Sequence, residues 1–142
     1  MTFVVDASVA LKWMFRTRDD EDDVAKALEL LRAIVEDRIT LLQPPHFVAE
    51  VCAVLARESP KRAQSSLRDL LAIEMQIVAT ESIYARAVSL ATRHGHHLFD
   101  TLYHAVALEA DDAMLVTADE HYIRRAKADG RITRLSAFAL GE

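Results

Sequence analysis

The amino-acid sequence predicts an α/β domain, a three-layer sandwich in which a central, mostly parallel, five-stranded sheet is flanked by helices. Short apolar runs rich in β-branched residues alternate with longer segments whose apolar residues recur every three or four positions. This alternation is typical of a parallel sheet covered on both faces. Only three glycines and three prolines interrupt the 142 residues, so most of the chain is expected in regular elements of a single domain spanning 1–142.

The first half of the chain is expected to hold two strands and four helices. Residues 2–5 form a short apolar run that stops at Asp6, as a buried parallel strand would. Pro44 and Pro45 can open a helix because proline suits the first helical turn, and Ser59 is a good cap for the next helix. The expected elements are a strand at 2–5, helices at 7–15 and 21–36, a strand at 40–42, a helix from about 44 and a helix from 59 to about 73.

The second half continues the same alternation. Residues 113–117 form the clearest strand in the chain, and Gly95 and Gly130 are each expected to follow the end of a helix. The expected elements are a strand at 76–79, helices at 82–94 and 99–111, the strand at 113–117, a helix at 119–129 and a short strand at 132–135.

The charge of the chain limits its possible functions. Its formal net charge of −5 argues against a protein that binds nucleic acid through a broad basic surface, although clustered acids could face phosphate once divalent cations bind them. No apolar run approaches the roughly 20 residues of a membrane helix, and the N-terminus lacks the basic start of a signal peptide. With Cys52 as the single cysteine, we expect a cytoplasmic protein that does not contact a membrane.

Four acidic residues are candidates for such a cluster: Asp6, Glu50, Asp100 and Asp119. Asp6 follows the first predicted strand and Asp119 the fourth, and ligands of parallel sheets bind beyond the carboxyl ends of the strands. Both aspartates could instead cap helices, and taken alone Asp6 favours that interpretation. Asp100 could equally be a first-turn acid that the helix dipole stabilises.

Glu50 is the most informative of the four acids. It lies three residues after Phe47 and four before Val54, so it borders the buried face of its helix. No lysine or arginine lies three or four residues away from it. Because desolvating an isolated carboxylate is unfavourable, Glu50 is expected to be paired or to bind a metal.

Other polar clusters have simpler structural interpretations. The acidic run at 19–23 suits a solvated helix start. His94, His96 and His97 surround a glycine-containing turn, and no set of cysteines accompanies them as in a zinc site, so they are expected to be exposed. His104 is expected to pack beside the acidic site rather than to act in it.

Four short segments carry a resemblance to a known family. They are V-V-D-A-S-V-A at 4–10, F-V-A-E-V at 47–51, L-F-D-T-L-Y at 98–103 and L-V-T-A-D-E at 115–120. In this order they resemble the PIN-domain nucleases, and more closely the VapC-type toxins, the ribonuclease half of bacterial type II toxin-antitoxin pairs. The resemblance implies a PIN-like fold whose first strand lies beside the fourth, so that Asp6 and Asp119 meet while Glu50 and Asp100 reach in from helices.

The resemblance also implies roles for the individual residues. All four acids are then expected to be catalytic and to bind metal, with Ser8 and Thr117 at supporting polar positions. Mg²⁺ or Mn²⁺ is the expected cofactor, because these hard cations prefer oxygen ligands. Whether one metal or two bind, and whether Glu120 adds a fifth ligand, stays open.

The function that follows is a metal-dependent endoribonuclease that hydrolyses RNA phosphodiester bonds and inhibits translation or growth. The resemblance further implies an antitoxin that inserts an arginine or lysine into the acidic groove, and a homodimer or toxin-antitoxin hetero-oligomer. The alternative is a catalytically weak PIN-like interaction module whose acidic groove binds a basic partner segment. The haloacid-dehalogenase phosphatase pattern is not met, because it needs an aspartate where Ser8 stands, and neither is the receiver pattern.

Overall fold

The computed structural model describes residues 1–18 and 22–140, and the strands in these ranges form one five-stranded sheet in the order β3-β2-β1-β4-β5. Every pairing between neighbouring strands is parallel. The strands are β1 (Thr2–Val5), β2 (Thr40–Gln43), β3 (Gln76–Ile77), β4 (Ala113–Thr117) and β5 (Ile132–Arg134). The predicted parallel sheet is confirmed, and so is the expected pairing of the first strand with the fourth.

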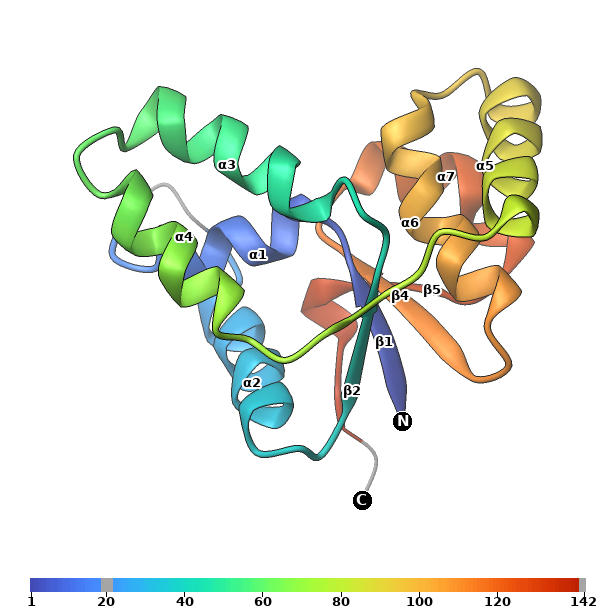
Figure 1. The fold of residues 1–142 in the computed structure, drawn as a ribbon. Helices are drawn as coiled ribbons and strands as arrows, with labels where there is room; N and C mark the ends of the chain where they lie inside the picture. The colour runs from blue at the N-terminus through green and yellow to red at the C-terminus, as the bar shows by residue number, and fades with distance from the viewer. Residues whose placement is uncertain (19–21, 141–142) are drawn as a thin grey trace.

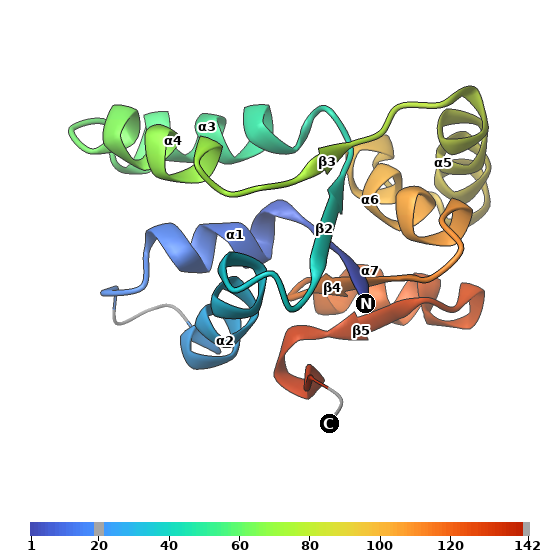
Figure 2. The same ribbon diagram turned by 60° about the horizontal axis from the view of Figure 1, so that its bottom comes forward.

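Helices cover both faces of the sheet, as Figure 1 shows, with α1 to α4 on one side of the central strands and α5 to α7 on the other. In Figure 2 the short β3 can be distinguished from β2, which it follows at one edge of the sheet. The helices are α1 (Ala7–Met14), α2 (Val24–Val35), α3 (Phe47–Glu58), α4 (Ala63–Leu71), α5 (Glu81–His94), α6 (Leu98–Glu109) and α7 (Glu120–Ala126), followed by 3₁₀ turns at Lys127–Asp129 and Leu135–Ala137.

Several predicted boundaries were wrong by one turn. Ser59 does not cap a new helix: its N–H donates to the carbonyl of Leu55, so Ser59 ends α3, and α4 begins only at Ala63. α2 begins at Val24 rather than at 21, and residues 19–21 of the acidic run lie outside the described part of the chain. The last turn of the predicted 119–129 helix is 3₁₀ rather than α.

The core lies where β1 and β4 meet α6. Val4, Val5 and Val116 are fully buried on the two central strands, and residues 101–107 of α6 are all buried because that helix packs on both strands and on α5. This packing fixes the start of α6, and hence Asp100, relative to the ends of β1 and β4. No helix in the described part of the chain combines the length and the apolar character that a bilayer crossing requires.

At the end of β1, the side chain of Gln43 makes the hydrogen bonds that the backbone of a neighbouring strand would make. Gln43, which is completely buried, accepts the N–H of Val5 through Oε1 at 2.8 Å and donates Nε2–H to the carbonyl of Val5 at 2.7 Å. The side-chain amide thus pairs the last residue of β1 on the side facing β2. The backbone that leads directly into Asp6 is therefore fixed on that side as well as by β4.

Gln43→Leu is expected to lower the free energy of unfolding by about 2–4 kcal/mol. Leucine fills a similar volume but leaves the N–H and the carbonyl of Val5 buried without partners, each costing about 1–3 kcal/mol. Urea denaturation monitored by circular dichroism measures the loss. Gln76→Leu, on the exposed β3, is the matched control and is expected to change stability by less than about 0.5 kcal/mol. Similar small changes in both variants would contradict the strand-like role of Gln43.

Candidate metal centre

The four acidic candidates lie at two strand ends and two helix starts. Asp6 follows β1 directly, and Asp119 lies two residues beyond the end of β4. Since β1 and β4 are parallel neighbours, both aspartates are at the same edge of the sheet, where the strand order reverses direction. Asp100 and Glu50 lie in the first turns of α6 and α3.

Asp6 is held by two hydroxyl groups. Ser8 Oγ donates to Oδ1 of Asp6, and Thr117 Oγ1 donates to Oδ2. Each hydroxyl in turn accepts a backbone N–H from the segment after β4: that of Ala118 to Ser8 at 3.2 Å and that of Asp119 to Thr117 at 3.0 Å. Although Asp6 precedes α1, its side chain makes no capping hydrogen bond, so the capping interpretation of this residue was wrong.

Burial raises the pKa of Asp6 from 3.8 to about 6. The hydrogen bonds from Ser8 and Thr117 oppose this rise, whereas the nearby charges of Asp119 and Asp100 add to it. The ionised carboxylate is thus unfavourable in the metal-free protein, and a bound cation would relieve both the burial and the repulsion between like charges.

Asp119 does cap a helix. Its Oδ1 accepts the backbone N–H of Tyr122 at 3.1 Å, which is the side-chain cap of α7. The cap uses one carboxylate oxygen, so Asp119 can serve the helix start and still offer the other oxygen to a cation. For this residue the structural and functional interpretations are compatible.

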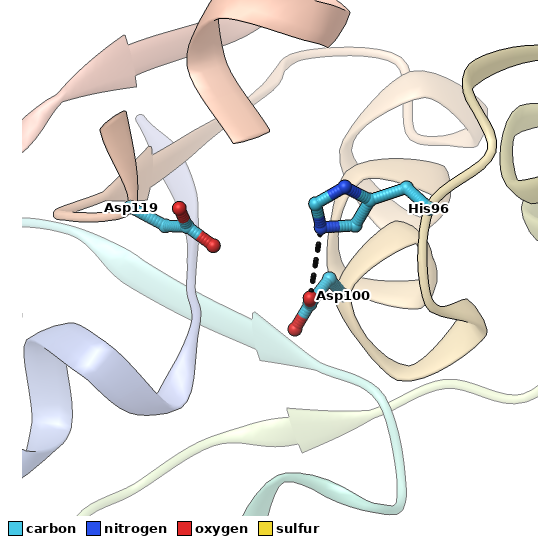
Figure 3. A group of neighbouring side chains, drawn as sticks. All are labelled: His96, Asp100 and Asp119. Carbon is cyan, nitrogen blue, oxygen red and sulfur yellow. Dashed lines mark hydrogen bonds and ion pairs between the residues drawn. The ribbon is translucent and has the colours of Figure 1, made fainter. Parts of the chain in front are cut away.

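Asp100 and Asp119 come together with a histidine that the sequence interpretation assigned to an exposed turn (Figure 3). His96 Nε2 lies 2.9 Å from Oδ2 of Asp100, and among the described residues one ligand atom each from His96, Asp100 and Asp119 lies within 4.8 Å of the others. Burial raises the pKa of Asp100, as do the charges of Glu50 and Asp119, while the hydrogen bond from His96 acts against the rise.

The predicted exposure of the three turn histidines was wrong for two of them. The side chains of His96 and His94 are only 9% and 14% exposed. His94 pairs with Asp129 at 2.6 Å, and the ring of His96 packs on Tyr122 with centroids 4.9 Å apart. Only His97 is exposed, and its Nδ1 caps α6. The turn is covered because it folds over α7, a contact between elements that lie apart in the sequence.

Glu50 is paired, as its position on α3 predicts, but by partners that are neither lysine nor arginine. The hydroxyl of Tyr103 donates to Oε1 at 2.6 Å, and His46 Nε2, four residues earlier, lies 3.2 Å from the same oxygen. Burial works to raise the pKa of Glu50, but the hydrogen bonds from His46 and Tyr103 and the nearby histidine charges outweigh it and lower the pKa. Glu50 is outside the group formed by His96, Asp100 and Asp119.

Tyr103 links the separate acids. Burial raises the pKa of its phenol, and the next causes are the hydrogen bond to Glu50 and the charges of Glu50, Asp6 and Asp100. Three of the four carboxylates therefore act on this one hydroxyl. The sequence interpretation missed Tyr103, His46 and His96. His46 and His96 each lie four residues before one of the acids, but both precede the helix that carries that acid, so this spacing alone was a weak signal.

Two further candidates, Glu120 and His104, have structural roles. Glu120, the possible fifth ligand, is exposed and pairs with Arg134 at 3.0 Å, and it is outside the group of candidate ligand atoms. His104 is fully buried: its Nε2 donates to the carbonyl of Gly130 at 2.7 Å, so Nδ1 accepts the hydroxyl of Tyr122 at 2.8 Å. His104 is linked to the site only through Tyr122, whose ring also packs against that of His96.

The donor set fits a divalent cation. Asp100 and Asp119 offer carboxylate oxygens, His96 offers a nitrogen, and the buried carboxyl of Asp6 lies close enough for their charges to raise its pKa. The site is separate from a cavity of about 680 Å³ between α1, α2 and α4, which none of the four acids lines. The candidate cation site is therefore distinct from this cavity.

Comparisons with known proteins agree with this architecture. Residues 3–128 match the model of the PIN domain family. No curated protein matches the chain. Among solved structures, the fold is similar to that of VapBC2 from Rickettsia felis bound to a DNA fragment from its promoter, with a TM-score of 0.67 and 18% identity over 94% of this chain and 98% of that chain.

Two other solved structures share the fold. VapBC-1 from nontypeable Haemophilus influenzae matches with a TM-score of 0.64 and 13% identity over 96% of this chain and 99% of that chain. A toxin-antitoxin complex from Klebsiella pneumoniae matches with a TM-score of 0.62 and 14% identity over 93% of this chain and 96% of that chain. With the family match spanning β1 to the end of α7 and an acidic edge at the junction of β1 and β4, the chain belongs to the PIN domain family.

Proposed function

We propose that this chain is a metal-dependent endoribonuclease, acting as a single PIN domain, and the toxin of a toxin-antitoxin pair. The observation that carries the proposal is the gathering of Asp100, Asp119 and His96 beside Asp6 at the edge where β1 and β4 end. The similarity of the fold to chains from three toxin-antitoxin complexes supports the toxin role.

The four acids have different roles in the proposed site. Asp100 and Asp119 would hold Mg²⁺ or Mn²⁺ directly, and Asp6 would face the cation from the position that Ser8 and Thr117 fix. When bound, the cation supplies Lewis acidity toward a phosphodiester and lowers the pKa of water. Both contacts to Glu50 fall on Oε1, which leaves Oε2 to orient a water or a cation.

RNA is the substrate class that this arrangement suits. A chain with a net charge of −5 and a cluster of carboxylates repels a polyanion until cations neutralise the cluster. We therefore expect divalent cations to be needed for binding RNA as well as for cleaving it. Such an enzyme would act in the cytoplasm, on an RNA whose identity depends on loops around the acidic edge.

The partner we propose is an antitoxin that places an arginine or lysine side chain among the acids. A guanidinium pairs with carboxylates in two-pronged fashion, so it would neutralise the cluster in place of the metal. The toxin would exist as a homodimer or as a hetero-oligomer with that antitoxin. Intact folding with neither metal binding nor cleavage would instead favour an interaction module that binds a basic segment.

Metal-dependent cleavage of RNA is the direct test. Purified protein is expected to cut a fluorophore-quencher RNA in Mg²⁺ or Mn²⁺, to stop in EDTA and to recover when the cation is restored. The control is the Asp6→Asn variant purified in the same way, because a contaminating ribonuclease would copurify with both proteins. Equal cleavage by the two preparations, or cleavage that survives EDTA, would overturn the proposal.

A further inference from the structure

His96 has the position of a metal ligand rather than of a turn residue. Two ligands at right angles on a cation, each at about 2.1 Å, lie about 3 Å apart, and opposite ligands lie about 4.2 Å apart. Nε2 of His96 is 2.9 Å from Oδ2 of Asp100, so this pair already has the spacing of adjacent ligands. The ligand atoms of the group with Asp119 all lie within 4.8 Å of one another, so a movement of about 0.6 Å or less would bring the most widely separated pair to the spacing of opposite ligands.

Residues of α7 hold both the backbone just before His96 and its imidazole ring. Arg125 donates to the carbonyls of His94 at 2.7 Å and Gly95 at 3.3 Å, and Gly95 adopts the left-handed conformation, with φ of 59°, that ends α5. Tyr122 packs edge-on against the imidazole ring of His96. Figure 3 shows the Nε2 edge of the ring directed at the carboxylate of Asp100, on the side where Asp119 lies.

We propose that His96 binds the catalytic cation through Nε2 and makes the site selective for Mn²⁺ over Mg²⁺. This inference rests on the proposed function, because it concerns the same cation. Imidazole nitrogen suits first-row transition metals, whereas Mg²⁺ prefers oxygen ligands and retains its waters. A cation bound at Nε2 requires the tautomer with its hydrogen on Nδ1. The cation then takes the place of the Nε2 hydrogen that joins His96 to Asp100, and this hydrogen is not needed to hold the pair together.

The competing role is indirect. If His96 only orients Asp100 through its hydrogen bond, the cation has an all-oxygen environment and no preference that depends on imidazole. His96→Gln separates the two roles, since the glutamine amide can still donate to Asp100 but offers no ring nitrogen. His121→Gln is the matched control: its ring centroid lies 5.6 Å from that of His96, but it is exposed on α7 and is not in the candidate ligand group.

Mn²⁺ itself is the probe. Electron spin echo envelope modulation of the wild-type protein loaded with Mn²⁺ is expected to show coupling to a ¹⁴N nucleus, which His96→Gln removes and His121→Gln retains. Titrations followed by the signal of free Mn²⁺, with Mg²⁺ as competitor, are expected to show Mn²⁺ binding weakened about tenfold or more in His96→Gln. Mg²⁺ binding should change by less than about threefold.

The outcomes separate the inference from the proposed function. Mn²⁺ that binds and supports RNA cleavage without ¹⁴N coupling in the wild-type protein would overturn the role of His96 and leave the ribonuclease intact. Coupling that persists in His96→Gln would equally overturn it. Absence of Mn²⁺ binding together with absence of cleavage would overturn both. Nitrogen coupling in a protein that cuts no RNA would support the ligand assignment and overturn only the proposed activity.

Discussion

Asp6→Asn is expected to abolish RNA cleavage and, at the same time, to stabilise the metal-free protein. Removing the carboxylate that faces the cation should lower the cleavage rate about a thousandfold or more, as for other residues that act as a unit in catalysis. Asparagine has nearly the same shape: its amide oxygen can accept from one of the two hydroxyls, and its NH₂ group can donate to the oxygen of the other, whose hydrogen then turns away. The loss of activity would therefore follow from the lost charge rather than from a lost fold.

The gain in stability follows from the raised pKa. Burial raises the pKa of Asp6 from 3.8 to about 6, so the folded state prefers the protonated acid. Its favourable contribution is fully present below the unfolded pKa and is lost as the pH rises through the folded value. Above that value the ionised group costs about 3 kcal/mol, and Asp6→Asn removes this cost. We expect the variant to be more stable by up to about 3 kcal/mol near pH 7 and nearly equal to wild type near pH 4.

Urea denaturation in EDTA at the two pH values measures this difference. The control is Asp129→Asn. The pKa of Asp129 is lowered because its bonds to His94 and Arg93 outweigh the effect of burial. That variant is expected to lose stability near neutral pH, the opposite sign for the same substitution. If Asp6→Asn proves less stable than wild type near neutral pH, ionised Asp6 does not destabilise the metal-free protein.

Asp119→Asn is expected to reduce cleavage about a thousandfold with little change in stability. Asparagine is as good an N-cap as aspartate, so the bond to the N–H of Tyr122 that begins α7 can persist. Asp119→Ala removes the cap as well and should lower the free energy of unfolding by about 1 kcal/mol. Kinetics on the quenched RNA and thermal denaturation of both variants separate the two roles of this residue.

Thr80 provides the matched control for capping alone. Its Oγ1 accepts the N–H of Ile83 at 3.3 Å and begins α5, at a helix that contributes none of the acids. Thr80→Ala is expected to cost about 1 kcal/mol and to leave the cleavage rate unchanged. Wild-type cleavage by Asp119→Asn would show that Asp119 is a cap and nothing more.

The sheet could be predicted from sequence because each strand depends on a local property. Short runs of buried β-branched and apolar residues identify β1 and β4 without knowledge of their partners. The boundary of α4 could not be predicted in the same way, since Ser59 is a good cap by composition but is already used by the preceding helix, where its N–H bonds to Leu55. Which helix such a residue serves depends on tertiary packing.

The site likewise could be predicted where it depends on local sequence but not where it depends on tertiary contacts. The position of Glu50 on the buried side of α3 predicted that it would need partners, but Tyr103 comes from another helix and leaves no local signal beside Glu50. His96 was misjudged because a histidine next to a glycine turn is usually exposed. Its burial depends on Arg125 and Tyr122, which lie on α7 and reach it only in the folded chain. The roles of the four acids in metal binding and cleavage stay predictions.

The hydroxyls of Ser8 and Thr117 link Asp6 to the backbone after β4 through hydrogen bonds that all donate toward the carboxylate. Each has a single hydrogen, and in both that hydrogen points to the carboxylate while the oxygen receives a backbone N–H from beyond β4. Such chains polarise cooperatively. A change of charge at Asp6 should thus be felt at the backbone amides of Ala118 and Asp119, 112 and 113 positions further along the sequence, so these two amide resonances would report on the occupancy of the acidic edge in solution.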